Sequence, residues 1–268
     1  MVGQVGDDNF GRDYFEALGQ ESIDGAGVKK VPGQTTGAAN IIVEEETGEN
    51  RILFTGGANL AYSEEKDGSW DLVPKQADVV VFQLEVPMRV VSLDKHFCNM
   101  RHLLTRGSKV LHNMHLARER GKHIIFNPAP ATLLPDFAYQ DIDTLVMNET
   151  EALILSQSKE QADLTPLLNR FLQLGVKDAV IITLGGNGVM YATASGKTGK
   201  VSAKKVKVVD TTAAGDTFLG AYAAKRVEGL SAKRTFDYEA ALEFATMAAG
   251  RTVEKKGAMD AIPRLNEL

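Results

Sequence analysis

Short runs of apolar, mostly β-branched residues alternate along this chain with longer stretches in which apolar positions recur every three or four residues. The runs at residues 77–84, 123–126, 144–147 and 179–183 predict strands, and the first of these is expected to be buried on both faces. Helices are predicted at residues 110–121, 149–156, 167–174 and 238–253. This regular alternation predicts an α/β fold with a mainly parallel sheet that helices cover on both sides.

The amino-terminal part of the chain has a different pattern. Residues 9–20 predict a short amphipathic helix, with Phe10 and Leu18 on its apolar face. Residues 34–43 and 50–54 predict two strands joined by an exposed hairpin tip. A glycine-containing turn follows the first residue closely, as though a strand had already ended there.

The segment Asp-Thr-Thr-Ala-Ala-Gly-Asp-Thr-Phe at residues 210–218 joins a strand expected at residues 206–209 to a helix expected at residues 219–224. Small residues at such a junction leave backbone N–H groups uncovered at the positive end of the helix dipole, which suits a phosphate or a developing anion. A carboxylate beside an anion site is unfavourable, so its presence suggests a function, and for Asp216 the obvious function is proton abstraction. The plainer interpretation is an ordinary helix start with Asp216 near its N-cap.

Four polar or glycine-rich loops follow the predicted strands, at residues 127–131, 148–151, 183–188 and 210–216. In an open parallel sheet, ligands bind beyond the carboxyl ends of the strands. The four loops are therefore expected to converge on one site.

Composition and charge limit the classes of function. The chain has 268 residues, 44% of them hydrophobic, which is enough for one large α/β domain. Its formal net charge of −5 argues against a nucleic-acid surface, and no apolar run is long enough to cross a membrane. The single cysteine, Cys98, excludes an intrachain disulfide and fits a reducing compartment. His96, Cys98 and His102 do not have the spacing of a standard metal site.

Several motifs together resemble the ribokinase branch of the ribokinase/phosphofructokinase-B sugar-kinase superfamily. The motif at residues 210–218 is similar to the carboxyl-terminal signature of the superfamily. Three further motifs resemble those of ribokinases in their order and spacing. They are Asn-Pro-Ala-Pro-Ala from Asn127, Asn-Glu-Thr-Glu from Asn148 and Thr-Leu-Gly from Thr183. Two other motifs restrict the resemblance to the ribokinase branch. They are Gly-Ala-Asn-Leu-Ala at residues 57–61 and Leu-Glu-Val-Pro at residues 84–87. It implies a three-layer α/β sandwich with a small, here incomplete, β lid, formed by one domain over residues 1–268 with the lid hairpin at about 34–55.

The resemblance also implies an activity, the ATP-dependent phosphorylation of D-ribose at its 5-hydroxyl. Asp216 would be the catalytic base, and the N–H groups of Ala213, Ala214 and Gly215 would form the anion hole. Glu85 would hydrogen-bond the sugar. Without the resemblance, Glu85 is more simply a solvated carboxylate at the end of a strand.

The same resemblance assigns residues to the nucleotide and to two cations. The residues expected near ATP are Asn148, Thr183, Gly185, Gly186, Asn187, Gly188, Gly215, Asp216 and Thr246. Glu151 would act on Mg²⁺ through water. The positions that match the activating K⁺ site are Asp210, Thr212, Thr252, Lys255, Gly257 and Ala261. The plainer alternatives are a helix cap formed by Asn148 and Glu151, a simple turn at residues 183–188, and a turn capped by Asp210.

The chain departs from the family pattern in two places. It lacks the amino-terminal segment with the Gly-Gly-Lys-Gly-Ala-Asn motif that grips the sugar, and it carries an insertion at about residues 91–108. We hypothesise that both are gene-model errors, and the competing interpretation is a divergent paralogue that has shed sugar binding. The alternative functions are another sugar or nucleoside kinase of the superfamily, or an inactive nucleotide-binding remnant.

The expected partners are D-ribose and ATP, with no nucleic acid and no membrane. The family's lid often mediates dimerisation, so the resemblance also implies a homodimer. We expect a cytoplasmic protein, and we leave open whether it also enters the nucleus.

Overall fold

The computed structural model describes residues 1–44, 50–62, 71–86, 109–159 and 163–268. They belong to two compact units. The first unit comprises Met1–Ile42, Arg51–Pro74 and Glu85–Leu116, and the second comprises Val43–Asn50, Lys75–Leu84 and Ala117–Leu268. The predicted insertion at 91–108 lies outside the described residues, and the prediction of a single domain stays a prediction.

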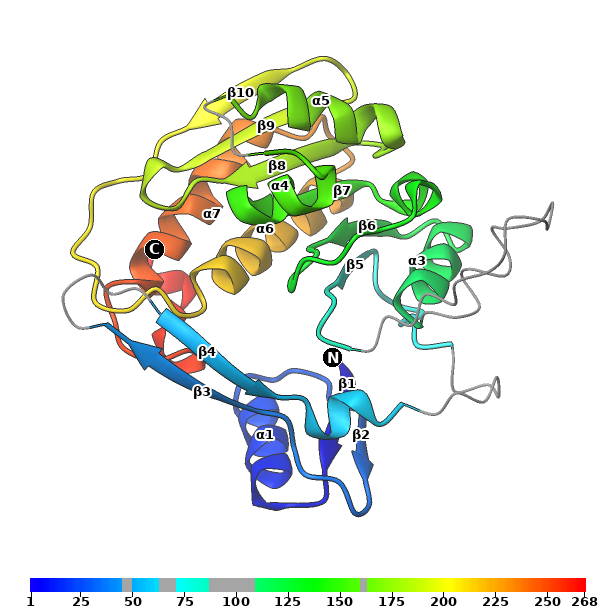
Figure 1. The fold of residues 1–268 in the computed structure, drawn as a ribbon, viewed down its shortest axis with the longest axis vertical. Coiled ribbons are helices and arrows are strands. Elements are labelled where there is room, and N and C mark those ends of the chain that lie inside the picture. Colours follow the sequence, from blue (N-terminus) through cyan, green and yellow to red (C-terminus); the bar gives the residue numbers. More distant parts are fainter. Residues whose placement is uncertain (45–49, 63–70, 87–108, 160–162) are drawn as a thin grey trace. The chain divides into compact units, whose positions relative to one another are not determined.

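The second unit is built on a six-stranded sheet with the strand order β10-β9-β8-β7-β6-β5 (Figure 1). The strands are β5 (Val79–Phe82), β6 (His123–Phe126), β7 (Thr144–Asn148), β8 (Ala179–Thr183), β9 (Val189–Thr193) and β10 (Thr198–Val201). Strands β5 to β8 are parallel, whereas β9 and β10 each run antiparallel to the preceding strand. The carboxyl ends of β5 to β8 therefore meet at one edge of the sheet.

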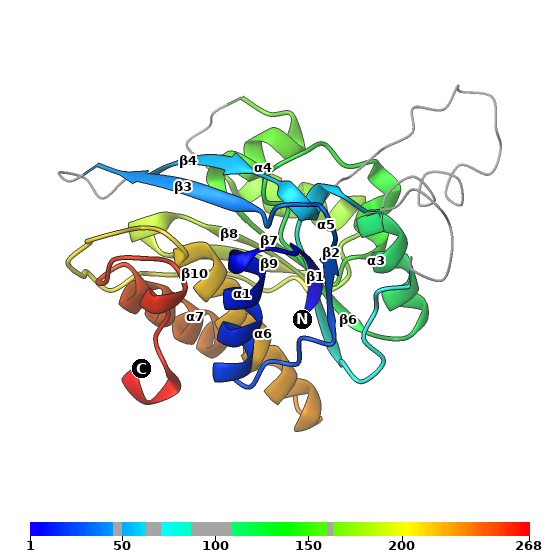
Figure 2. The same cartoon turned by 90° about the horizontal axis from the view of Figure 1, so that it is seen from below.

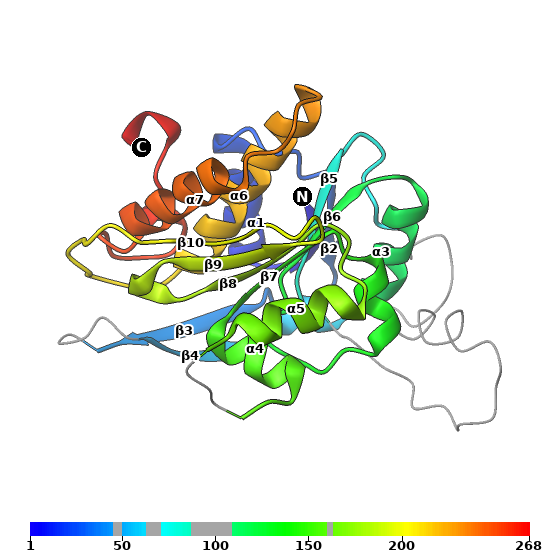
Figure 3. The same ribbon diagram turned by 90° about the horizontal axis from the view of Figure 1, so that it is seen from above.

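Helices lie on both faces of this sheet (Figure 3). α4 (Glu149–Ser156) and α5 (Thr165–Leu174) cover one face, and α6 (Ala214–Ser231) and α7 (Tyr238–Thr252) cover the other. α3 (Lys109–Glu119) precedes β6 in the chain. Short 3₁₀ helices are formed by Gly57–Leu60, Asp136–Asp141, Gly185–Asn187, Met259–Ala261 and Leu265–Glu267. The predicted three-layer α/β architecture is confirmed.

The core between the sheet and the pair α6–α7 explains why these helices pack where they do. Ile181 and Tyr191 project from the sheet against Phe218, Tyr222 and Leu242, and all five side chains are buried. Burying such side chains supplies roughly 1.5–3 kcal/mol each relative to leaving them exposed. In the first turn of α6, Gly215 and Asp216 are exposed, whereas Thr217 is buried next to Phe218.

A charged cluster lies at the amino ends of β6, β7 and β8. Arg118 pairs with Asp143 at 2.7 Å, and Arg226 pairs with Asp178 at 3.0 Å. His123 lies among them with 9% of its side chain exposed. Burial, followed by the positive charge of Arg226, lowers the pKa of His123 to about 4, although Asp143 and Asp178 act in the opposite direction. His123 is therefore neutral at pH 7.

The first unit contains a much smaller sheet. β1 (Val2–Gly6) and β2 (Gly27–Val31) form a parallel two-stranded sheet, and α1 (Asn9–Gln20) connects them (Figure 2). Their core is Val5, Leu18 and Val28, with Tyr14 and Phe15 packed against it. This core is far smaller than the one that α6 and α7 form with the larger sheet.

Asp8 links the start of α1 to Thr36 through hydrogen bonds. Its carboxylate accepts hydrogen bonds from Gly11 N at 2.9 Å, which caps α1, and from Thr36 N at 2.7 Å. The Thr36 hydroxyl also donates to Asp8 at 2.6 Å. The hydrogen bond from the Thr36 side chain, followed by those from the backbone of Thr36 and Gly11, lowers the pKa of Asp8.

β3 (Ala38–Val43) and β4 (Asn50–Thr55) form a second two-stranded sheet. It corresponds to the predicted hairpin, although β3 begins four residues later than expected. Thr35 O instead accepts a hydrogen bond from Ala58 N at 2.8 Å, and Thr36 N donates to Asp8. The hairpin's role as a lid stays a prediction.

Two sequence predictions about strands are wrong. Residues 206–209 form no strand, because the N–H groups of Val209 and Asp210 donate to Val253 O, at 2.7 and 3.3 Å, and not to a sheet. β5 is not buried on both faces: it is the outermost of the strands in the described residues, and Val81 is 40% exposed.

Other elements are as predicted or were missed. The helix at 9–20, the strands at 123–126 and 179–183 and the helix at 149–156 have the predicted bounds. Strands β2, β9 and β10 were not predicted, and the first residues, interpreted as the end of a strand, form β1. None of the helices in the described ranges is long and apolar enough to cross a membrane.

Candidate active site

The site lies at the carboxyl ends of β5 to β8. Asn148 and Thr183, the last residues of β7 and β8, are partners in the parallel register, so the loops that they begin lie side by side. Phe82 and Phe126 are partners in the same way at the ends of β5 and β6. The structure therefore brings three of the four predicted loops to one edge of the sheet.

The fourth loop leads into α6. Ala213 precedes the helix with φ 61°, a left-handed conformation that is uncommon for a residue with a side chain and that costs roughly 1–3 kcal/mol. In the described part of the chain, the N-cap residue Ala213 makes no side-chain hydrogen bond to the start of α6. Ala214 N makes a long hydrogen bond of 3.3 Å to Thr211 O. The exposed first turn of α6 thus offers backbone donors, at the positive end of a long helix, to an external anion.

Asp216 lies in that first turn and is exposed. Its Oδ1 is 3.4 Å from Nε2 of Gln83, the residue that follows β5. Gln83 Nε2 also donates to Oδ1 of Asn127, which follows β6, at 2.9 Å. Asp216 therefore points toward the ends of β5 and β6 and not into the protein interior.

Sequence reasoning missed Gln83 as a site residue. The signal that could have found it is a polar residue directly after four consecutive apolar residues, at the carboxyl end of a predicted strand. Asn127 was included in a predicted loop but was given no role of its own.

Asn148 and Glu151 form a complete capping box at the start of α4. Glu151 N donates to Asn148 Oδ1 and Asn148 N donates to a Glu151 carboxylate oxygen, both at 2.8 Å. Partial burial raises the pKa of Glu151, and the hydrogen bond from Asn148 opposes that shift. The capping interpretation is thus correct, and each side chain still has acceptor positions for a ligand or a hydrated cation.

The glycines of the loop after β8 differ in whether the fold has room for a side chain at their position. Gly188 has φ 93°, and a Cβ there would collide with the carbonyl oxygen of Val201, so Gly188 is required by the fold. Nothing lies within 4 Å of a Cβ placed at Gly185 or Gly186. These two residues and Asn187 are exposed, so their backbone is open to a ligand.

Thr246 on α7 has a buried hydroxyl without a hydrogen-bond partner among the described residues. Buried hydroxyls nearly always have a partner. The observation is consistent with a ligand or water at this position.

The residues predicted for K⁺ come from two segments that Asp210 joins. Asp210 is only 5% exposed, and its carboxylate accepts hydrogen bonds from Thr212 N at 2.9 Å and Gly257 N at 3.0 Å. Burial opposes its ionisation, but the hydrogen bonds from Thr212 and Gly257 outweigh burial and lower the pKa of Asp210. Thr252 O is already occupied by Lys255 N at 3.1 Å, and Ala261 N donates to Ala258 O at 3.1 Å.

This donor set fits a monovalent cation better than a transition metal. Within the described residues, no group of three His, Cys, Asp or Glu side chains could hold a metal. The carboxylate of Asp210 is buried, and the positive charge of Lys256 also lowers its pKa.

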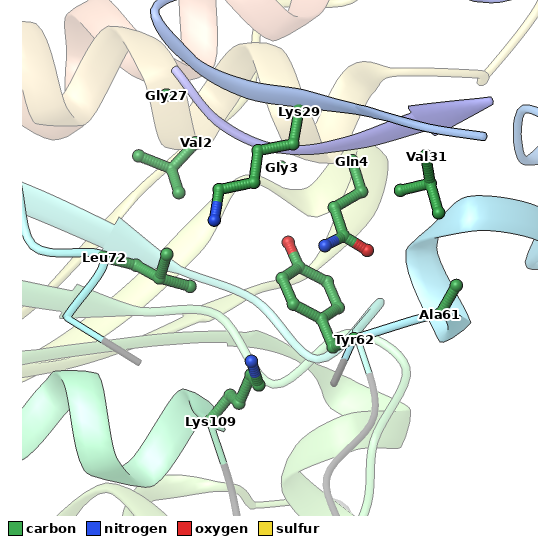
Figure 4. Close-up of a pocket in the computed structure, with 10 residues that line it drawn as sticks. All are labelled: Val2, Gly3, Gln4, Gly27, Lys29, Val31, Ala61, Tyr62, Leu72 and Lys109. Carbon is green, nitrogen blue, oxygen red and sulfur yellow. The ribbon is translucent and has the colours of Figure 1, made fainter. Parts of the chain in front are cut away.

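Glu85 is the only predicted site residue that belongs to the first unit, and it is exposed. The first unit also contains a cavity of about 260 Å³ between β1–β2 and the segments that carry Tyr62, Leu72 and Lys109 (Figure 4). Lys109 Nζ lies 5.0 Å from the centre of the Tyr62 ring, and burial raises the pKa of Tyr62. No predicted site residue lines this cavity.

A parallel sheet, a helix start that carries a carboxylate and an exposed glycine loop are features that suit an α/β enzyme of the phosphotransferase class. The sequence pattern described as pfkB family carbohydrate kinase matches residues 1–265. The chain belongs to this family, and it is a carbohydrate kinase.

Relatives and solved structures agree with this assignment. The chain is 37% identical to a ribokinase of Schizosaccharomyces pombe over 272 residues, which cover 100% of this chain and 77% of that protein. It is 34% identical to a ribokinase of Staphylococcus aureus, with 100% of this chain and 80% of that protein covered. The structure of Arabidopsis thaliana ribokinase complexed with ribose and ATP is similar with a TM-score of 0.78 and 29% identity, and the match covers 98% of this chain and 78% of that one.

Proposed function

We propose that this protein transfers the γ-phosphoryl group of ATP to the 5-hydroxyl of D-ribose, with Asp216 as the general base. The observation that carries the proposal is an exposed carboxylate in the first turn of an uncapped helix, 3.4 Å from a side chain at the end of β5. The similarity to proteins named ribokinase supports ribose as the acceptor, and the neighbour that contains ribose and ATP supports both substrates.

In the proposed reaction, Asp216 takes the proton of the sugar hydroxyl as its oxygen attacks the γ-phosphorus. The bond from that phosphorus to the β–γ bridging oxygen breaks, and ADP leaves with the electron pair. The N–H groups of Ala213, Ala214 and Gly215 stabilise the charge on the transferred group. Positioning and charge stabilisation account for most of the catalysis in such transfers.

The nucleotide would lie along the loops after β7 and β8. Gly185, Gly186 and Asn187 present open backbone, and the unpartnered hydroxyl of Thr246 supports a ligand near α7. Thr183 and Asn148 would hold the phosphates from the strand ends. Gly188 supports the turn and needs no contact with ATP.

Two cations complete the proposal. Glu151 would hold Mg²⁺ through water, and Mg²⁺ supplies charge neutralisation to the phosphates when it is bound. Asp210, with main-chain oxygens of the Thr212 and 252–261 segments, would hold K⁺. Because Asp210 is hydrogen-bonded to Thr212, a cation there would order the loop that precedes Asp216.

An assay of ADP release tests the acceptor. The protein is incubated with Mg²⁺, K⁺ and ATP, and with D-ribose, fructose 6-phosphate, adenosine or no acceptor. We expect ribose to give the largest rate above the reaction without acceptor. A larger rate with fructose 6-phosphate or adenosine would contradict ribose as the substrate and assign the chain to another branch of the family.

A second function is favoured by one feature of the structure. Glu85, the predicted sugar ligand, belongs to the unit with the small two-stranded sheets, whereas the nucleotide residues all belong to the six-stranded unit. A protein that binds nucleotide without transferring phosphate to a sugar would need only the nucleotide residues of the six-stranded unit. Titration calorimetry with an ATP analogue, next to the ADP assay, separates this outcome: nucleotide binding without ribose-dependent ADP release would support it.

A further inference from the structure

We infer that Gln83 is a positioning residue that orients the carboxylate of Asp216. This inference rests on the proposed role of Asp216 as the base. It follows from a continuous set of hydrogen bonds that runs from the sheet to Asp216 and lies entirely within the second unit.

The backbone on both sides of Gln83 is fixed. Phe82 O accepts a hydrogen bond from Asn127 N at 2.9 Å, and Leu84 N donates to Ala129 O at 2.9 Å. Gln83 therefore lies between two residues that are tied to the loop after β6. The backbone that carries the Gln83 side chain is therefore fixed, although Gln83 follows the outermost described strand of the sheet.

The orientation of the Gln83 amide is set by its neighbour. Asn127 Nδ2 donates to Val146 O at 3.0 Å, and a backbone carbonyl can only accept. Asn127 must therefore present Oδ1 to Gln83, and Gln83 must present its NH₂ group to Asn127. The same NH₂ group has a second hydrogen to donate, and its Nε2 lies 3.4 Å from Oδ1 of Asp216.

Asp216 needs such a partner because it is exposed on the first turn of a helix and its side chain can rotate into solvent. A hydrogen bond from an anchored amide favours the rotamer of Asp216 that faces the strand ends. A distance of 3.4 Å is long for a hydrogen bond, and hydrogen bonds of active sites are often long when no substrate is bound.

Two substitutions test the role of Gln83 through turnover. Gln83→Met keeps the length of the side chain but removes the donor, and we expect kcat to fall about 5-fold with the KM for ATP unchanged. Gln83→Glu keeps the shape but places a second negative charge beside Asp216, and we expect a larger fall than for methionine. A purely packing role would give the opposite order, since glutamate is the closer match in shape. Gln173→Met, on the exposed side of α5, is the matched control and should leave kcat unchanged.

A spectroscopic measurement tests the contact without turnover. The side-chain amide resonances of Gln83, assigned from their loss in Gln83→Met, should move in Asp216→Asn and stay in place in Asp163→Asn, an exposed control. Resonances that do not move in Asp216→Asn would overturn the inference.

The outcomes distinguish this inference from the proposed function. If Asp216→Asn abolishes turnover while Gln83→Met and Gln83→Glu equal the wild type, Gln83 has no positioning role and the proposed base stands. If Asp216→Asn retains turnover, the proposed base is wrong and the positioning role fails with it, even where the resonances show the contact.

Discussion

The strands of the two units differ in how completely they are paired and covered. In the second unit, β6, β7 and β8 each lie between two other strands, and Ile124, Phe126 and Ile181 are completely buried. In the first unit, β1 and β2 pair only with each other within the described ranges, over a small core. Parallel sheets are normally buried on both faces, and a two-stranded sheet alone is marginally stable. The second unit can therefore hold Asp216, Asn148 and Thr183 rigidly, whereas the first has much less to hold its own residues.

The largest expected difference is in hydrogen exchange. Amides of β8 should exchange only through global unfolding, whereas amides of β1 and β2 open locally. We expect protection to be about 10³-fold greater for β8, which corresponds to about 4 kcal/mol. Native-state exchange followed by mass spectrometry or NMR measures both regions in one sample. Equal protection of β2 and β8 would remove the contrast between the units.

The next largest effect concerns the glycines after β8. Gly188→Ala places a side chain at φ 93° against Val201 O, and we expect it to destabilise the second unit by about 3 kcal/mol. Gly186→Ala, two residues away in open space, should change the free energy of unfolding by less than about 1 kcal/mol. Urea unfolding followed by circular dichroism compares the two. Similar losses for both would show that the loop is not packed as described.

A smaller effect is expected from pH. The pKa of His123 is about 4 in the folded protein and about 6.5 when unfolded, so the unfolded chain takes up the proton first as the pH falls. The stability from neutral His123 is thus present above pH 6.5 and lost toward pH 4, by about 2 kcal/mol between pH 7 and pH 5. His123→Gln should flatten this part of the pH dependence in urea titrations. An unchanged slope in that variant would assign the dependence to other groups.

Much of the second unit was predictable from local pattern. Strands β6 and β8 are continuous apolar runs between turn residues, and α4 begins with a capping box that is visible in the sequence. Because such signals are local, their bounds were predicted correctly. The convergence of the loops after β6, β7 and β8 followed from one general rule about parallel sheets.

The wrong or missing predictions concern residues whose structure depends on contacts with parts of the chain that are distant in sequence. The residues of β5 are as apolar as those of β6, but β5 is half exposed because no described strand lies on its outer edge. Residues 206–209 alternate like a strand, yet their hydrogen bonds go to the end of α7. The contact of Gln83 with Asp216 joins residues 133 positions apart, which no local pattern can show.

The central claim is that Asp216, held at the carboxyl edge of the six-stranded sheet, deprotonates the acceptor hydroxyl. The most direct measurement compares ribose-dependent ADP release and nucleotide affinity in the wild type and Asp216→Asn. We expect kcat to fall about 10²–10⁴-fold while the Kd for an ATP analogue changes less than about 3-fold. Turnover that stays within about 10-fold of the wild type, or an equal loss of nucleotide binding, would contradict the claim.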